Sequence, residues 1–181
     1  MELIEGIKGR RSVRKFEDKK IPHELIEQIV DAARFSPSWK NTQCVRYLVV
    51  EDPEKIKKIA TEDCMLKFPF NVKTAGRAAA IVLLCTKKGI SGFEKDGSFS
   101  TPKGDHWQSF DAGAAAEAFC LAAYAHGVGT VIMGIFDEAK LREAVPVPSD
   151  EEIAALIPMG FPLSVSQAPP RKPVSELLSF E

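Results

Sequence analysis

The sequence has few cysteines, and their arrangement predicts no metal site. The four are Cys44, Cys64, Cys85 and Cys120; no two form a CxxC pair, and no Cys/His spacing matches a zinc site. Cys85 and Cys120 lie in apolar runs, which is typical of small core residues. We therefore expect no bound metal and a reducing compartment.

Long hydrophobic runs are also missing. No apolar run reaches the ~20 residues that a membrane-spanning helix needs. The first residues, MELIEGIKGRR, mix charged with apolar side chains, unlike a signal peptide. Both absences favour a cytoplasmic protein without a membrane partner. The net charge of −1, from 24 Lys+Arg and 25 Asp+Glu, gives no general attraction to nucleic acid. Local charge clusters therefore carry more information than the total.

Two catalytic signatures are absent as well. A G-x-S-x-G elbow does not occur, so we expect no catalytic triad. A G-x-G-x-x-G dinucleotide motif is missing too, because its nearest match, Gly127-Val128-Gly129, precedes a predicted strand. Among the histidines, only His106, which adjoins Trp107 after a long polar stretch, is a candidate for substrate contact. A structural or solvated role remains the simpler interpretation for it.

The chain of 181 residues is 45% hydrophobic and 27% charged, which suits a single domain, 1–181, with its own core. Helical spacing and capping residues predict helices over 22–35, from Asp52 to about 61, over 107–126 and over 138–145. Apolar runs predict strands over 45–51, 79–86, 128–135 and 152–159. The uneven alternation favours an α+β fold or a mixed sheet over a doubly wound one.

Three stretches have further meaning. The continuous apolar run at 79–86 fits a strand buried on both faces. The alanine-rich helix at 107–126 is apolar all round, which is typical of a central core helix. The glycine-rich polar stretch at 87–105 is long enough to indicate a functional loop or lid, whose role its composition does not reveal. The proline-rich tail, 163–181, has little reason to exist in a compact monomer, so we expect it to wrap a partner.

A basic cluster lies near the N-terminus. Residues 10–15 hold four cations and a hydroxyl. In an extended segment Arg10, Ser12 and Arg14 point the same way, and the planar fork of arginine matches phosphate oxygens. A phosphate monoester would suit such a site. A solvated basic turn explains the composition equally well, and a nucleic-acid arm is a third interpretation that the even net charge disfavours.

The motifs around this cluster resemble those of the nitroreductase family of FMN enzymes. The resemblance covers nearly the whole chain, in the family's order. It is carried by RRSVRKF at 10–16, SPSWKNTQ at 36–43, the stretch from Asp111 through GVGTVIMG, IPMGFP at 157–162 and PPRKPVSELL at 169–178. It implies a central mixed, mainly antiparallel sheet flanked by helices, in an obligate homodimer whose termini embrace the neighbouring subunit.

The resemblance also implies a set of cofactor-binding residues. Arg10, Ser12 and Arg14, helped by Arg11, would contact the FMN phosphate and ribityl chain, and Arg171 would reach the phosphate from the tail. The ring would lie between two further groups, with a backbone N–H near flavin N5: Pro37, Ser38, Trp39 and Asn41, contributed by the partner subunit, and Ile132, Met133 and Gly134. No catalytic side chain is implied, because the flavin carries the chemistry.

Two positions depart from the family pattern. Cys44 stands where a proline is common, and Trp39 where a small residue is common, so Trp39 would narrow the site and could stack on substrate. The implied reaction is ping-pong: NAD(P)H reduces FMN, then a nitroaromatic, quinone or similar acceptor takes the electrons. The alternatives are a different flavin reaction, such as dehalogenation or flavin cleavage, a flavin-storage protein, and a nucleic-acid-binding protein without flavin.

Overall fold

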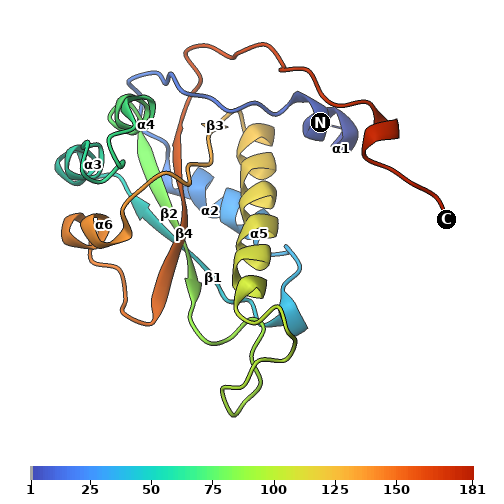
Figure 1. Cartoon of the computed structure of the whole chain (residues 1–181). Helices are drawn as coiled ribbons and strands as arrows, with labels where there is room; N and C mark the ends of the chain where they lie inside the picture. Colours follow the sequence, from blue (N-terminus) through green and yellow to red (C-terminus); the bar gives the residue numbers. More distant parts are fainter. Residues whose placement is uncertain (1) are drawn as a thin grey trace.

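The computed structural model describes residues 2–181; Met1, the first residue of the predicted domain, lies outside them. A four-stranded sheet runs through the chain in the order β1-β2-β4-β3 (Figure 1). The strands are β1 (Val45–Val50), β2 (Ala80–Lys87), β3 (Gly129–Thr130) and β4 (Glu151–Gly160). All three strand pairings are antiparallel, and a single parallel bridge joins Ser12 to Thr130. The α+β fold with a mixed, mainly antiparallel sheet is confirmed.

Helices cover both faces of this sheet (Figure 1). On one face lie α2 (His23–Ala33) and α5 (His106–Ala125); on the other lie α3 (Pro53–Ile59), α4 (Pro69–Ala75) and α6 (Glu138–Ala144). Strand β2 serves both cores, because Val82 and Leu84 pack toward α2 and α5 while Ile81 and Leu83 pack toward the other layer. The prediction that 79–86 is a strand buried on both faces is therefore confirmed.

Local capping chemistry fixes several helix starts. The Asp52 carboxylate accepts a 2.9 Å hydrogen bond from the Glu54 N–H at the start of α3, and Asp137 accepts one of 3.1 Å from the Lys140 N–H at the start of α6. Two helices were not predicted, α1 (Leu3–Gly9) and α4. Like α3 and α6, each is seven residues long and too short for a clear helical periodicity, but neither has a side-chain cap that marks its start.

The predicted strand over 128–135 is wrong in its extent. Strand β3 ends at Thr130, and beyond it only an isolated bridge joins Met133 to Leu156. The facing residue on β4 is Pro158, which accepts a hydrogen bond from the Val131 N–H but has no N–H to return. The ladder therefore breaks, and Ile132 and Gly134 become exposed.

Helix α5 is only partly the central helix that its composition predicts. One face is in the core, with Phe119, Cys120 and Ala123 almost fully buried. The opposite face is covered only near Glu117 and Tyr124, by the residues around the end of α1, within the part of the chain that the structure describes. Residues on it at helical spacing stay partly or fully exposed, namely Phe110, Gly113, Ala114, Glu117, Leu121 and Tyr124. The apolar surface of α5 is thus buried by this chain on one side and remains largely exposed on the other.

Close packing fixes the basic segment, residues 10–14, against β3. A Cβ added to Gly129 would lie 2.8 Å from the Cβ of Val13, a buried residue. We expect Gly129→Ala to lower the free energy of unfolding by about 1–3 kcal/mol, the usual cost of overpacking. Urea denaturation measures this. Gly76→Ala is the matched control, because its Cβ would meet only ordinary contacts of 3.4 and 3.5 Å. Equal effects of both substitutions would contradict the tight fit.

Candidate cofactor site

The basic segment runs along the edge of the sheet in an extended conformation. The Val13 N–H donates to the Thr130 carbonyl at 2.9 Å, and further along the Glu17 N–H donates to the Phe161 carbonyl at 2.8 Å. Val13 and Phe16 are buried and anchor the segment. Between and before these anchors, Ser12 is half-buried and Arg14 is exposed. The backbone is therefore held rigidly while its polar side chains face outward.

The three guanidinium groups of the segment differ in their contacts. Arg10 Nε lies 3.2 Å from Glu117 Oε1 on α5, and Arg14 makes only a long 3.4 Å hydrogen bond to the Ser12 carbonyl. Arg11 folds back and donates to the carbonyls of Lys8 and Arg10 at the end of α1. Within residues 2–181 the remaining N–H groups of Arg10 and Arg14 donate to nothing. Arg10 and Arg14 therefore keep most of their donors for an anion, and Arg11, which uses the N–H groups of one nitrogen, keeps fewer.

A small cavity adjoins the segment. Its volume is about 80 Å³, and its lining comes from the basic segment, the end of α5, β3 and the start of the tail, through Arg10, Arg11, Val13, Tyr124, Gly127, Val128, Gly129, Thr130, Pro162 and Val165. Arg171, further along the tail, is exposed, and within residues 2–181 it donates only to the Pro169 carbonyl, at 3.5 Å. One chain alone therefore does not join Arg171 to the basic segment.

Residues 132–134 continue from β3 along the same edge. The Met133 side chain is in the core and its N–H donates to the Leu156 carbonyl, so Met133 offers neither to a ligand. Ile132 is 44% exposed, and a Cβ added to Gly134 would meet nothing within 4 Å. Asn71 on α4 donates to the Ile135 carbonyl at 3.2 Å and supports this stretch, a role that the sequence did not predict. The result is an open backbone surface onto which a flat ring could lie.

Residues 37–43 form a second polar group, at the other end of α5. Trp39 begins the short helix η1 (Trp39–Asn41), and its backbone N–H donates to both carboxylate oxygens of Asp111. The Trp39 ring lies 4.5 Å from that of Trp107. Arg10, by contrast, shares the small cavity with Tyr124. Tyr124 lies thirteen positions, about 20 Å, further along the helix than Asp111, and Glu117, with which the Arg10 guanidinium pairs, lies six positions, about 9 Å, further along. One chain therefore holds the two predicted halves of the site apart (Figure 1).

The long loop, residues 88–105, is tied to the 37–43 segment. Lys40 Nζ lies 2.8 Å from Glu94 Oε1, and the Trp107 indole N–H donates to Thr101 Oγ1 at 2.9 Å. The hydrogen bonds from Lys40 and then from Ser100 lower the pKa of Glu94, so this contact weakens as the pH falls through that lowered pKa. His106 is exposed at the start of α5. The loop is thus a structured neighbour of the segment.

Cys44 does not have the environment of a reactive thiol. Its side chain is 1% exposed, and Sγ lies 3.6 Å from Asp111 Oδ2. Burial, and then the negative charge of Asp111, raise the pKa of the Cys44 thiol. At neutral pH it is therefore a protonated hydrogen-bond donor, and not a nucleophile.

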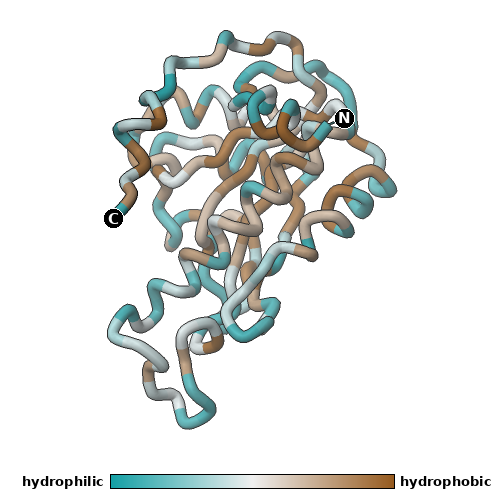
Figure 2. The backbone as a smooth tube through the Cα atoms, turned by 90° about the vertical axis from the view of Figure 1, so that its right-hand side faces the viewer, coloured by the Kyte–Doolittle hydropathy of each residue, from teal (hydrophilic) through white to brown (hydrophobic). Residues whose placement is uncertain are grey.

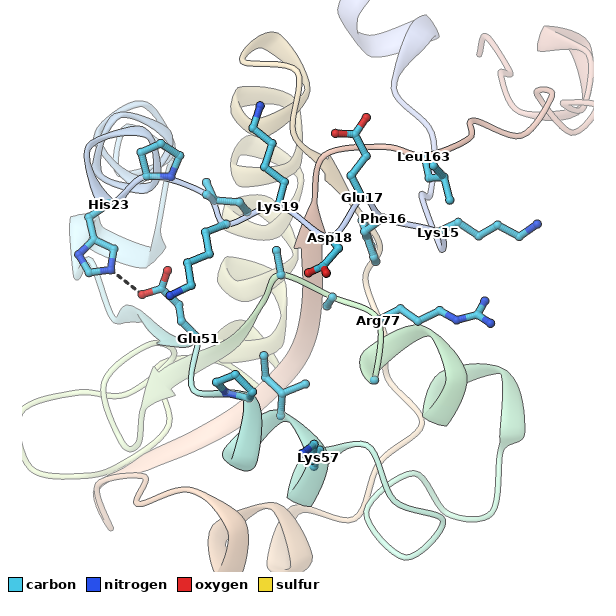
Figure 3. Close-up of a pocket in the computed structure, with 18 residues that line it drawn as sticks. Lys15, Phe16, Glu17, Asp18, Lys19, His23, Glu51, Lys57, Arg77 and Leu163 are labelled. Carbon is cyan, nitrogen blue, oxygen red and sulfur yellow. Dashed lines mark hydrogen bonds and ion pairs between the residues drawn. The ribbon is translucent and has the colours of Figure 1, made fainter.

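A larger cleft lies elsewhere. It measures about 990 Å³ and opens between residues 15–23, the ends of β1 and β2, and helices α3 and α4 (Figure 3). Lys15, Lys57 and Arg77 line it together with acidic groups, and His23 Nε2 lies 2.6 Å from Glu51 Oε2. None of the predicted site residues lines this cleft. Two of the predicted anion donors, Arg10 and Arg11, instead line the small cavity at β3, which makes that edge the stronger candidate.

An α+β sheet carrying a basic segment beside an open strand edge defines the class of protein. The model of the Nitroreductase family matches residues 7–161, and the chain belongs to this family. A Methanothermobacter thermautotrophicus protein provisionally named NADH dehydrogenase/NAD(P)H nitroreductase is 30% identical, over 90% of this chain and 78% of its own length. Iodotyrosine deiodinase from Nematostella vectensis is 28% identical, over 98% and 74%.

Solved structures agree with the fold. A nitroreductase family protein from Clostridium novyi NT is 29% identical, with a TM-score of 0.76 over 90% of this chain and 86% of its own. A protein from Exiguobacterium sibiricum, described as a nitroreductase in complex with FMN, has a TM-score of 0.82 at 22% identity, over 100% and 98%. Among residues 2–181, no helix is both long and apolar enough to span a membrane.

Proposed function

We propose that the protein is an FMN-dependent, NAD(P)H-using oxidoreductase that works as a homodimer. The observation that carries this proposal is the basic segment, pinned beside β3 with guanidinium donors to spare and followed by the open backbone at Gly134. The chemistry that FMN supplies is hydride uptake from NAD(P)H and delivery of electrons, in ping-pong order, to a nitroaromatic, quinone or similar small acceptor. The protein supplies binding, orientation and electrostatics.

The residues present fit FMN. Arg10, Ser12 and Arg14 would bind the phosphate and ribityl chain, with a smaller part for Arg11, because its guanidinium already caps α1. Arg171 would complete the phosphate site. Ile132 and Gly134 would face the ring. Since the Met133 N–H is already bonded, the backbone donor toward N5 would come from Ile132 or Gly134, whose N–H groups have no partner within residues 2–181.

The other half of the site also has capacity for a ligand. Three buried polar atoms, Ser36 Oγ, Trp39 Nε1 and Thr42 Oγ1, have no hydrogen-bond partner within the described residues. Buried polar groups normally have one, so a missing neighbour is the simplest explanation. Pro37, Ser38, Trp39 and Asn41 would approach the ring that is bound by the partner subunit, which removes the separation of about 10–20 Å along α5.

The homodimer is supported by unpartnered apolar surface. Every residue from 163 to 181 is exposed, and α1 exposes Leu3 at 70% and Ile4 at 59%. Both terminal segments project on the side of α5 away from the sheet (Figure 1), and both carry hydrophobic residues (Figure 2). Together with the open face of α5, these residues form exposed apolar surface of the kind that marks interaction sites. A second copy that covers α5 and receives the tail would bury these groups.

Phe110 gives a direct test of this interface. It is 65% exposed on the open face of α5, so we expect Phe110→Ser to leave the unfolding free energy of one chain nearly unchanged. The loss of its burial against a partner should raise the dimer dissociation constant about tenfold or more. Sedimentation velocity over a dilution series measures this, with Phe70→Ser, a 69% exposed aromatic on α4 at the other face of the sheet, as the control. Equal dissociation constants for both variants would contradict an interface on α5.

A different flavin reaction is the second candidate. Relatives named iodotyrosine deiodinase match nearly the whole chain, which favours reductive dehalogenation as the specific alternative. A flavin-storage protein would have the same cofactor without turnover. The acceptor therefore separates the enzymatic candidates, and reduction by NAD(P)H separates both from storage.

The test of function begins with the purified protein. We expect a yellow protein that releases FMN on denaturation and bleaches anaerobically with NADH or NADPH. Mixing the reduced protein with nitroaromatics, quinones and halotyrosines in a stopped-flow instrument then ranks the acceptors by rate. A colourless protein that cannot be reconstituted with FMN would refute the proposal, and a yellow protein that neither nucleotide bleaches would favour storage.

A further inference from the structure

Asp111 is a buried carboxylate on α5. Its exposed fraction is 2%, and within residues 2–181 it takes part in no ion pair. Burying an ionised carboxylate is costly unless hydrogen bonds replace its water. The sequence around it is rich in alanine, and α5 would pack on the sheet with another small residue there. Packing alone therefore does not explain a carboxylate at this position.

The donors to Asp111 come from three separate segments. The Trp39 backbone N–H lies 3.1 and 3.0 Å from the two carboxylate oxygens, Ser91 Oγ donates to Oδ2 at 2.8 Å, and Cys44 Sγ contacts Oδ2 at 3.6 Å. Ser91 is itself fully buried. One carboxylate thus joins α5 to the 37–43 segment, to the start of β1 and to the 88–105 loop.

The 37–43 segment needs such an anchor, because its backbone is strained. Lys40, Asn41 and Gln43 have positive φ values of 46°, 56° and 50°, although none is glycine. For Lys40 and Gln43 this costs about 1–2 kcal/mol each, and less for Asn41, and such conformations persist only where the surroundings impose them. Inside the segment, Ser38 Oγ accepts the Gln43 N–H at 2.9 Å. The bond from Trp39 to Asp111 is the one that connects this closed turn to the core.

We propose that Asp111 is a positioning residue, whose carboxylate fixes the 37–43 segment and the 88–105 loop to α5 and thereby sets the shape of the acceptor site. The extension to the acceptor site rests on the proposed function, in which Trp39 and its neighbours lie along the flavin of the partner subunit. The positioning itself rests on the contacts of this chain alone. Asp111 acts through Trp39 and Ser91 and does not itself touch the cofactor.

The two tryptophans allow the positioning to be tested without flavin. Trp39 and Trp107 are the only tryptophans in the chain, and their rings lie 4.5 Å apart at 41°. Near-ultraviolet circular dichroism of the apoprotein therefore reports where the segment lies. In Asp111→Asn an amide N–H₂ replaces one acceptor oxygen beside the Trp39 N–H. We expect the tryptophan signal to fall about twofold or more, because aromatic coupling depends on ring geometry. Asp105→Asn, an exposed aspartate just before α5, should leave it unchanged.

Steady-state kinetics then test the extension. We expect Asp111→Asn to lower kcat/KM for the acceptor about tenfold or more, the scale of a hydrogen bond to a charged group. The FMN dissociation constant should change less, because the phosphate donors are at the other end of α5. Ser91→Ala, which removes one donor and keeps the carboxylate, should shift both readouts in the same direction by a smaller amount. It also serves as the test if Asp111→Asn does not fold.

The outcomes separate the two steps. A wild-type tryptophan signal in Asp111→Asn, or in Ser91→Ala if that is the only variant that folds, would overturn the positioning role whatever the activity. A changed signal with wild-type kcat/KM would overturn the extension to the acceptor site. If the wild-type protein bound no FMN, the proposed function would fail, and the apoprotein spectrum would still decide the positioning role.

Discussion

Replacing both Arg10 and Arg171 by alanine is expected to abolish FMN binding at micromolar concentrations. Each guanidinium would contribute a charged hydrogen bond to the same phosphate, worth about 1.5–3 kcal/mol, so each single variant should raise the dissociation constant about 10- to 150-fold. The Arg10 side chain is 21% exposed beside a cavity, which limits its screening by water. Titration of apoprotein into FMN, followed by the loss of flavin fluorescence, measures the FMN dissociation constants of the wild type and of the three variants.

A charge-matched control separates the effect of the Arg10 and Arg171 substitutions on FMN affinity from that of a general loss of positive charge. Arg34→Ala removes an equal charge from an exposed arginine that pairs with Asp31, and we expect no change in FMN affinity. If Arg10 and Arg171 bind one phosphate, their effects should not simply add, because groups that share a partner are coupled. Unchanged FMN affinity in both single variants would refute the assignment of the phosphate site to the basic segment and the tail.

Much of the fold could be predicted because local chemistry and global packing agree. The continuous apolar run of β2 indicates burial on both faces, and the two cores on either side of it require that. Asp52 and Asp137 predict helix starts because a short carboxylate reaches the free N–H groups of the first turn. At these positions the local structure is determined by a few residues that are neighbours in the sequence.

Other features could not be predicted because their cause lies far along the chain. The strand at 128–135 looks continuous by composition, but it is interrupted because Pro158 faces it from β4. Met133 pairs with Leu156 of the same strand β4, and its side chain is buried in the core. The donors to Asp111 come from positions as far as 72 residues away. The available signal was a single carboxylate on the core side of an apolar helix, and it does not reveal its partners.

The candidate site likewise has a part that could be predicted from the sequence and a part that could not. The order of motifs predicts a basic segment, a ring-facing strand edge and a tail, and the structure places the first two side by side. The relation of the 37–43 segment to them was not derivable from spacing, because α5 separates the segment from Arg10 within one chain. If two subunits build the site jointly, the spacing of its residues in one sequence does not reveal which of them lie together. Its assembly has to be measured in the dimer.

Subunit complementation makes that measurement. In one variant Arg10→Ala and Arg14→Ala remove the basic half of the site, and in a second variant Trp39→Ala and Asn41→Ala remove the ring-facing half. Each homodimer should have little or no activity, because each of its sites lacks one half. In the heterodimer, symmetry pairs the intact basic half of one chain with the intact 37–43 segment of the other. One of the two sites is then complete.

We therefore expect the heterodimer, co-expressed with two different affinity tags and purified on both, to recover about half of the wild-type activity per dimer. Its FMN content should be about one per dimer. The matched control is a heterodimer of the first variant with a chain that carries all four substitutions, which contains no complete site in either arrangement. If each chain built its site alone, both heterodimers would be equally inactive. Recovery in the first and none in the second would therefore require a site shared between subunits, which is what we propose from the separate positions of Arg10 and Trp39 along α5.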